Sequence, residues 1–286
     1  MRPGFSVSDR PIAAAVGLDL SALFAPGGGK SAVRSGAATD TVRSAVSGGV
    51  RRFSGPEGAE VLVGLAPSST FTLQLAPGFD LGRRIQSARE SLNSAHGLEL
   101  ALSGAALVAG GGDDFWRQAR RLSDGVPLGV TVRPGGDPLG VARRFKPDFM
   151  ELSVSLLDQR LIHSDALAEV AATGVEVRLR TAMLRSLLFL PREGLPLPLA
   201  DAGPQVSRVR RVIAEAGADP LQAAVGFALS RPEAAVVIVE AASVGEVRAL
   251  LAAAAAPLPQ LDWAALALHH PAALDAEADL YRRVAA

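Results

Sequence analysis

The chain has 286 residues, of which 49% are apolar and 20% are charged, and its 29 lysines and arginines equal its 29 aspartates and glutamates. Without net charge the chain lacks the field that recruits nucleic acid or an anionic membrane, and the absence of cysteine excludes disulfides, thiolate catalysis and thiolate metal sites. The length fits one large domain spanning 1–286, on the roughly 250-residue scale of a (β/α)8 barrel. We therefore expect a small-molecule ligand or a protein partner.

We expect no targeting segment among the N-terminal residues. Asp19 interrupts the apolar run in 12–20, no cleavage region follows, and nowhere do eighteen apolar residues run without charge or proline. We expect a cytoplasmic protein.

A glycine-rich stretch, "APGGGKSAV" at 25–33, approximates a phosphate-binding P-loop. The motif needs a glycine five residues before Gly29, but Phe24 stands there. The following residues 32–40 are too rich in turn formers to open a helix, so we expect a surface loop.

Eight short apolar or β-branched runs predict strands. They are residues 12–20, 49–53, 70–76, 98–102, 127–132, 148–154, 175–180 and 234–241. Amphipathic stretches between some of them predict helices over 81–95, 113–125, 166–174 and 243–256, with Asp113 or Asp114 as one N-cap and Gly174 as one terminator. Residues 189–205 are proline-rich and predict a long loop. Eight strands alternating with helices favour a closed parallel barrel of the TIM type over an open sheet.

Several of these segments resemble aldo-keto reductases, near the sugar-dehydrogenase branch. The similarity is clearest in "DFMELSVSLLDQR" at 148–160 and in the predicted helix, strand and helix of 219–251. Three further stretches are similar: 41–66, 84–102 and 167–189. The resemblance implies a (β/α)8 barrel with an NAD(P)-dependent carbonyl or alcohol site at its C-terminal face.

The residues that such chemistry requires are missing. The family uses a tyrosine as general acid, a lysine that lowers the tyrosine pKa, an aspartate that supports the lysine, and a histidine that orients the carbonyl. The resemblance places Ser54 at the aspartate, Gln74 or Leu75 at the lysine, and Ser103 or Gly104 at the histidine. The segment that should hold the tyrosine has none. The sequence contains one tyrosine, Tyr281, and two lysines, Lys30 and Lys146, the latter at the N-terminal entrance of a strand.

The cofactor positions are altered as well. The resemblance assigns NADPH or NADP contacts to Glu151, Ser155, Thr181, Arg185 and Ser243, and puts Ala249 and Leu250 where the family holds the adenine. Arg185 stands where a small residue is usual, and could bind phosphate or fill the groove. Glu151 has a second interpretation, as a structural carboxylate paired with Arg178 or Arg180.

Three other features admit simpler interpretations. His269 and His270 lack the spacing of a metal site, so we expect no metal. Arg208, Arg210 and Arg211 either contact an acidic partner or form a solvated face. Glu57 and Glu60 either form an acid/base pair or complement a helix dipole.

The sequence thus predicts an aldo-keto reductase-like barrel without the catalytic tetrad, acting as a binding or scaffolding protein. One alternative is an active NAD(P)-dependent oxidoreductase on a small carbonyl or sugar substrate, with a relocated acid, Glu57, Glu60 or Glu151. Another is a non-redox enzyme that reuses the mouth of the barrel.

Overall fold

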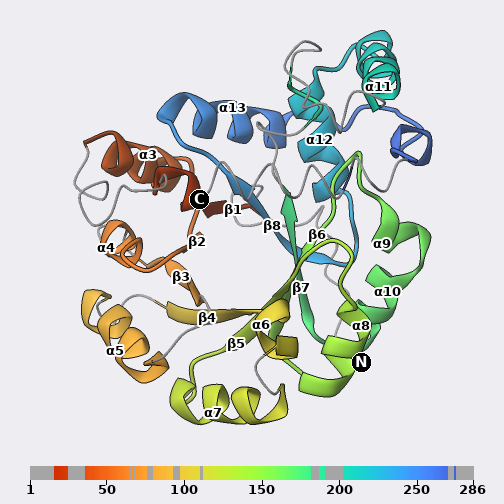
Figure 1. The fold of residues 1–286 in the computed structure, drawn as a ribbon. Coiled ribbons are helices and arrows are strands. Elements are labelled where there is room, and N and C mark those ends of the chain that lie inside the picture. Colours follow the sequence, from red (N-terminus) through yellow and green to blue (C-terminus); the bar gives the residue numbers. More distant parts are fainter. Residues whose placement is uncertain are drawn as a thin grey trace.

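The computed structural model describes residues 16–24, 36–64, 66, 68–75, 80–92, 97–109, 112–181, 187–190, 202–269 and 274. These residues form a parallel barrel that closes in chain order, β1 to β8, surrounded by helices (Figure 1). No helix among them is long and apolar enough to cross a bilayer.

All eight predicted strands are confirmed. The strands are β1 Val16–Asp19, β2 Arg52–Gly55, β3 Thr70–Leu75, β4 Gly97–Ser103, β5 Leu128–Val132, β6 Phe149–Ser153, β7 Glu176–Thr181 and β8 Ala234–Glu240. Every neighbouring pair is parallel, and β1 pairs with β8 to close the barrel.

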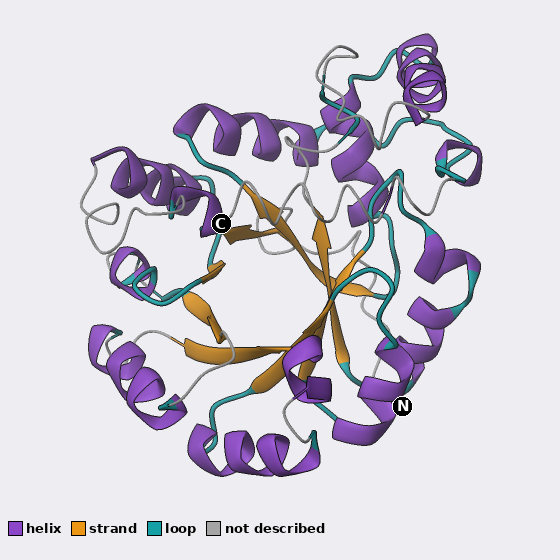
Figure 2. Cartoon of the chain, viewed as in Figure 1, coloured by secondary structure: helices purple, strands orange, loops and turns teal. Residues whose placement is uncertain are grey.

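Helices connect the strands on the outside of the barrel (Figure 2). They are α3 Gly36–Ser47, α4 Glu60–Val63, α5 Leu81–Ser91, α6 Gly104–Ala109, α7 Asp113–Ser123, α8 Pro138–Phe145, α9 Arg160–His163, α10 Ala166–Ala172, α11 Gly203–Glu215, α12 Pro220–Leu229 and α13 Val244–Ala255. Two short 3-10 helices, η2 Ser21–Leu23 and η5 Ala264–Leu266, complete the described elements.

The main hydrophobic core lies between the strands and this helical layer. In β7, for example, Val177 and Leu179 are buried and belong to the core cluster, as do Leu100 and Leu102 of β4. Because successive strand residues point to opposite faces, the residues between them face the barrel axis.

Three expectations about element ends are wrong. Helix α3 begins at Gly36, inside the stretch 32–40 that was expected not to open a helix. Helix α11 begins at Gly203, within the predicted loop 189–205, because Pro204 suits the first turn of a helix. Gly112, not Asp113 or Asp114, precedes α7, and both aspartates lie in its first turn, where they complement the helix dipole. Gly174, with a φ of 86°, does follow the end of α10.

Candidate functional site

The barrel axis is lined mainly by polar and charged side chains. Register partners in parallel strands share a face, and the series Asp19, Ser54, Thr72 and Glu99 runs across β1 to β4 in this way. Contacts between Arg180 on β7 and Asp19 on β1, which are not adjacent strands, can only cross the interior. Barrels of this class usually fill these positions with branched apolar residues, so the polar axis is a distinctive feature of this chain.

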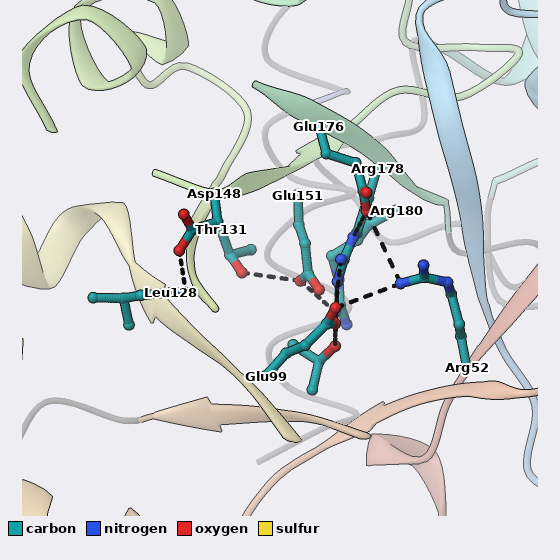
Figure 3. A network of polar contacts seen from close by, with 10 residues as sticks. Arg52, Glu99, Leu128, Thr131, Asp148, Glu151, Glu176, Arg178 and Arg180 are labelled. Atoms are coloured by element: carbon teal, nitrogen blue, oxygen red, sulfur yellow. Dashed lines mark hydrogen bonds and ion pairs between the residues drawn. The ribbon is translucent and has the colours of Figure 1, made fainter. Parts of the chain in front are cut away.

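Arg178 organises the half of the axis nearer the N-terminal ends of the strands (Figure 3). Its Nη1 and Nη2 donate to the two carboxylate oxygens of Glu99 at 2.6 and 2.9 Å, and its Nε donates to Glu176 at 2.7 Å. The guanidinium also lies 3.7 Å from the ring centroid of Phe149. Burial alone would raise the pKa of Glu99, but the hydrogen bonds and charge of Arg178 hold it below its usual value. Arg52 adds a second cation, 3.5 Å from Glu99.

Arg180 organises the half nearer the C-terminal ends of the strands, where active sites of TIM barrels lie. It forms an ion pair with Asp19, and its Nη1 donates to Glu151 Oε2 at 2.9 Å. The amide of Gln74, assigned with its oxygen toward the guanidinium, accepts from Nη1 at 2.7 Å and Nη2 at 3.1 Å. Burial lowers the pKa of Arg180 to about 10, so the side chain stays protonated at neutral pH.

Glu151 is the most deeply buried acid of this group, with no exposed surface. Its Oε2 accepts from Thr131 at 3.0 Å as well as from Arg180, whereas its Oε1 has no hydrogen-bond partner among the described residues. Burial raises its pKa to about 7, against the opposing charge of Arg178. The expected pairing of Glu151 with an arginine is confirmed, and the partner is Arg180.

The three tetrad positions lie at the same end of the barrel. Ser54 is buried, and its Oγ has no partner among the described residues. Gln74 contacts Arg180, and Ser103 ends β4 beside Thr131 in register. They are brought to one region, but none is a phenol, an amine or an imidazole. Lys146 lies far from them, exposed at the end of α8 before β6.

Ser155 and Ser243, two predicted cofactor residues that the structure describes, are already engaged in local hydrogen bonds. The Oγ of Ser155 accepts from the backbone of Asp158 at 3.0 Å, and Ser243 caps α13 by accepting from Glu246 N at 3.2 Å. Leu250 is buried in the core. Thr181 ends β7, but its side chain, like Arg185, lies outside the described residues.

The alternative acid pair is not assembled. The carboxylate of Glu57 is half-exposed and accepts from Arg84 Nε at 2.6 Å. Glu60 is buried and accepts from Gly58 N at 2.7 Å, within its own loop. Glu151 is therefore the only one of the three relocated-acid candidates that this part of the structure places on the axis.

The arginine run of α11 has a structural role in part. Arg210 donates to the carbonyls of Leu187 and Leu188 at 2.9 and 2.7 Å, while Arg208 and Arg211 are exposed. Some features of the sequence analysis lie outside the described residues: the stretch 25–33 with Lys30, His270 and Tyr281. The described residues contain no cluster of three or more His, Asp or Glu side chains that could hold a metal ion.

The "LLDQR" turn that resembles the reductases fastens the C-terminal segment to the barrel. The buried Gln159 donates from Nε2 to the carbonyls of Leu156 at 2.9 Å and Trp263 at 2.6 Å. Leu268 N donates to Leu157 O at 2.9 Å. In the described structure, this motif therefore serves packing.

Sequence reasoning missed Asp19 and Glu99 as members of the axis. The signal that could have found them is the alternation of polar and apolar residues along a strand. Polar residues at every second position of a buried parallel strand face the interior, and β7 shows this with Glu176, Arg178 and Arg180.

Comparison with known proteins gives a match in structure but not in sequence. A scan against models of protein families found no match, and a search of curated proteins found none either. The similar solved structures include the holo form of an aldo-keto reductase from Bacillus halodurans and a glycerol dehydrogenase from Gluconobacter oxydans. The first has a TM-score of 0.66 and 14% identity over 95% of this chain and 92% of its own. The second has a TM-score of 0.65 and 15% identity over 99% of this chain and 94% of its own. The chain therefore has the (β/α)8 barrel fold of the aldo-keto reductases.

Proposed function

We propose that this chain is a non-catalytic binding or scaffolding protein built on an aldo-keto reductase barrel. One observation carries the proposal: where the family would place its tetrad, Arg180 is held by Asp19, Glu151 and Gln74. Even with its pKa lowered to about 10, this guanidinium stays protonated at neutral pH, so it is a poor proton donor there. Ser54 and Ser103 cannot replace the missing aspartate and histidine, since a hydroxyl neither carries charge nor titrates near neutrality.

The described residues at the family's dinucleotide positions also do not fit NADP. Ser243 is engaged in a helix cap with Glu246, and Leu250 packs in the core instead of offering a polar group. The proposed function therefore involves no nicotinamide cofactor.

The test is a measurement of NADPH oxidation by the purified full chain with a panel of aldehydes, ketones and aldoses. An active aldo-keto reductase serves as the positive control. We expect no consumption of NADPH above the rate without protein, and no saturable binding of NADPH or NADP in a calorimetric titration. Turnover at an ordinary enzymatic rate would refute the proposal.

A second candidate is oxidoreduction with Glu151 as a relocated proton donor. The observation in its favour is the pKa of about 7, because a carboxyl near neutrality is present in both protonation states and can exchange a proton. If turnover is found, the variant Glu151→Gln decides whether this residue is the donor: the rate falls by at least about 100-fold if Glu151 supplies the proton.

A further inference from the structure

A groove lies on the outside of the barrel, between α3 and α13. The two helices pack side by side because β1 and β8, the strands that precede them in the chain, pair to close the barrel (Figure 1). The groove has a volume of about 670 Å³, and its walls come from residues 40–48 on one side and 244–251 on the other. Sites for small molecules usually have volumes of roughly 300–1,000 Å³, so this groove has room for one.

The walls of the groove carry one positive charge more than they balance. On α3, Arg43 lies 3.5 Å from Asp40, so this cation has an acid of its own. On α13, Arg248 is exposed and has no acid within ion-pair distance in the described part of the chain, nor one at three or four residues from it in the helix. Glu246, the acid nearest to it in the chain, accepts from Ala242 N at 2.6 Å in the helix cap. The surplus charge is therefore that of Arg248.

Beside this charge, the groove presents apolar and hydroxyl groups. Val244 and Leu251 lie on the same face of α13 as the arginine, and both are half-buried. A Cβ on Gly48 would lie 2.2 Å from Leu251 Cδ1, so the leucine side chain extends over the end of α3, where Gly48 leaves room for it. Ser44 and Ser47 line the α3 wall, and their hydroxyls have no hydrogen-bond partner among the described residues.

We propose that the groove between α3 and α13 binds a small monocarboxylate with an apolar body, and that the carboxylate pairs with Arg248. The planar guanidinium matches the two oxygens of a carboxylate, and one negative charge balances the surplus. The apolar body then covers Val244 and Leu251 and removes their exposed surface from water. A dianion, such as a phosphate monoester, would leave one of its charges without a partner.

The groove differs from the place where the family resemblance puts a dinucleotide. Ser243, Ala249 and Leu250 stand at the family's cofactor positions, and none of them lines the groove. The groove also belongs to the outer layer of helices and not to the axis of the barrel, where Arg180 lies. The inference therefore goes beyond the proposed function and does not depend on it.

The test uses four probes that share or lack parts of this ligand: phenylpropanoate, phenylpropanol, phenylpropylammonium and acetate. Each is titrated calorimetrically into the full chain at neutral pH and low salt, because salt screens an exposed charge. We expect phenylpropanoate to bind in the millimolar range or tighter. The alcohol and the ammonium compound lack the negative charge, and acetate lacks the apolar body, so each is expected to bind at least about tenfold more weakly.

Variants separate the groove from the general charge of the protein. Arg248→Gln should weaken the binding of phenylpropanoate at least about tenfold. Arg83→Gln is the matched control, because it removes the same charge from an exposed arginine on α5, and it should bind as the parent does. Asp40→Asn frees Arg43 and should strengthen binding by up to about fivefold. Ser47→Tyr keeps the charge but fills the groove, so it should abolish binding. Circular dichroism checks that each variant is folded.

Nuclear magnetic resonance of the isotope-labelled parent chain locates the site. Amide signals of residues 40–48 and 244–251 should shift as phenylpropanoate is added. The inference would be overturned if phenylpropanoate did not bind, if any other probe bound as tightly, or if the shifts were confined to other residues. Each of these results is obtained with the parent chain, even if a variant fails to fold. NADPH turnover would refute the non-catalytic role and leave this inference unchanged, so the two proposals can fail separately.

Discussion

At the scale of single residues, Arg178 is the side chain on which one half of the barrel interior depends. It is almost fully buried, and it binds Glu99 through both terminal nitrogens and Glu176 through Nε. Bidentate pairing of this kind holds a carboxylate in one orientation. Glu99 is buried as well, so removal of the arginine would leave a charge with only the more distant Arg52 to balance it.

We expect Arg178→Met to lower the free energy of unfolding by about 3–5 kcal/mol, because breaking a buried pair on one side leaves an uncompensated charge. The measurement is urea denaturation followed by circular dichroism. The double variant with Glu99→Met removes that charge too and should recover part of the loss. Simple addition of the two single effects would contradict the assigned pairing.

At the scale of elements, the contact of β5 with β6 depends on the absence of a side chain at Gly129. A Cβ on Gly129 would lie 2.3 Å from the ring of Phe149, closer than atoms approach without displacement. The same ring supports the guanidinium of Arg178. Gly129 therefore makes room for an aromatic ring inside the barrel.

Gly129→Ala is expected to lower the free energy of unfolding by roughly 1–3 kcal/mol, because the added methyl group overpacks the interior. Thermal unfolding of the single variant and of the pair with Phe149→Leu tests the reason. The smaller side chain should restore most of the loss. No recovery in the pair would show that the ring is not what the methyl group meets.

Helix α13 begins with a pair of reciprocal caps. Ser243 Oγ accepts from Glu246 N, and Glu246 Oε2 accepts from Ala242 N at 2.6 Å. This Ser-x-x-Glu arrangement satisfies backbone donors at the helix N-terminus. We interpret Ser243 as a cap, although its position in the family resemblance suggested cofactor binding.

Replacement of Ser243 by alanine should lower the free energy of unfolding by about 1 kcal/mol, the usual cost of losing an N-cap. Asp219→Ala is a matched comparison, since Asp219 caps α12 in the same way through Leu221 N and Gln222 N. Denaturation of both variants is the measurement. An unchanged midpoint for Ser243→Ala alone would refute the cap as its main role.

The elements of the fold were largely predictable, and the site only in part. Strands such as 128–132 and 234–240 carry apolar runs that define them locally. The start of helix α11 was not predicted, because it lies in a proline-rich segment. Proline disfavours the interior of a helix, but Pro204 lies in the first turn of α11, where proline is tolerated. The pairing of Glu151 with an arginine was foreseen, whereas the roles of Asp19 and Glu99 depend on which strands face each other across the axis, and no short stretch of sequence contains that information.

At the scale of the whole molecule, the barrel has an apolar core between its strands and helices, and an ionic axis inside the strands. Ion pairs across the axis join strands that are not neighbours, such as β1 with β7 and β4 with β7. Buried ion pairs contribute little net stability compared with apolar packing, because desolvation offsets the attraction. Their main consequence here is that the stability of the barrel follows the protonation of its interior.

Two interior acids act on that stability with opposite sign. The pKa of Glu99 is lowered in the folded chain, so its contribution is present above its usual value of 4.5 and is lost as pH falls through the folded value. The pKa of Glu151 is raised from 4.5 to about 7, so the folded chain holds a proton in this window that the unfolded chain has released. Its contribution is present at low pH and is lost as pH rises through about 7.

We therefore expect the melting temperature to be higher near pH 5 than near pH 8. The pKa shift of Glu151 corresponds to a fall of up to about 3 kcal/mol in the free energy of unfolding across this range. Glu151→Gln cannot titrate, so its melting temperature should change less between the two pH values, whatever the substitution does to stability overall. Differential scanning calorimetry in buffers of equal ionic strength measures both profiles, with Glu215→Gln as the control for an exposed acid. Parallel profiles for the parent and Glu151→Gln would mean that Glu151 is ionised throughout this pH range in the folded chain, and would refute the raised pKa as the cause of the pH dependence.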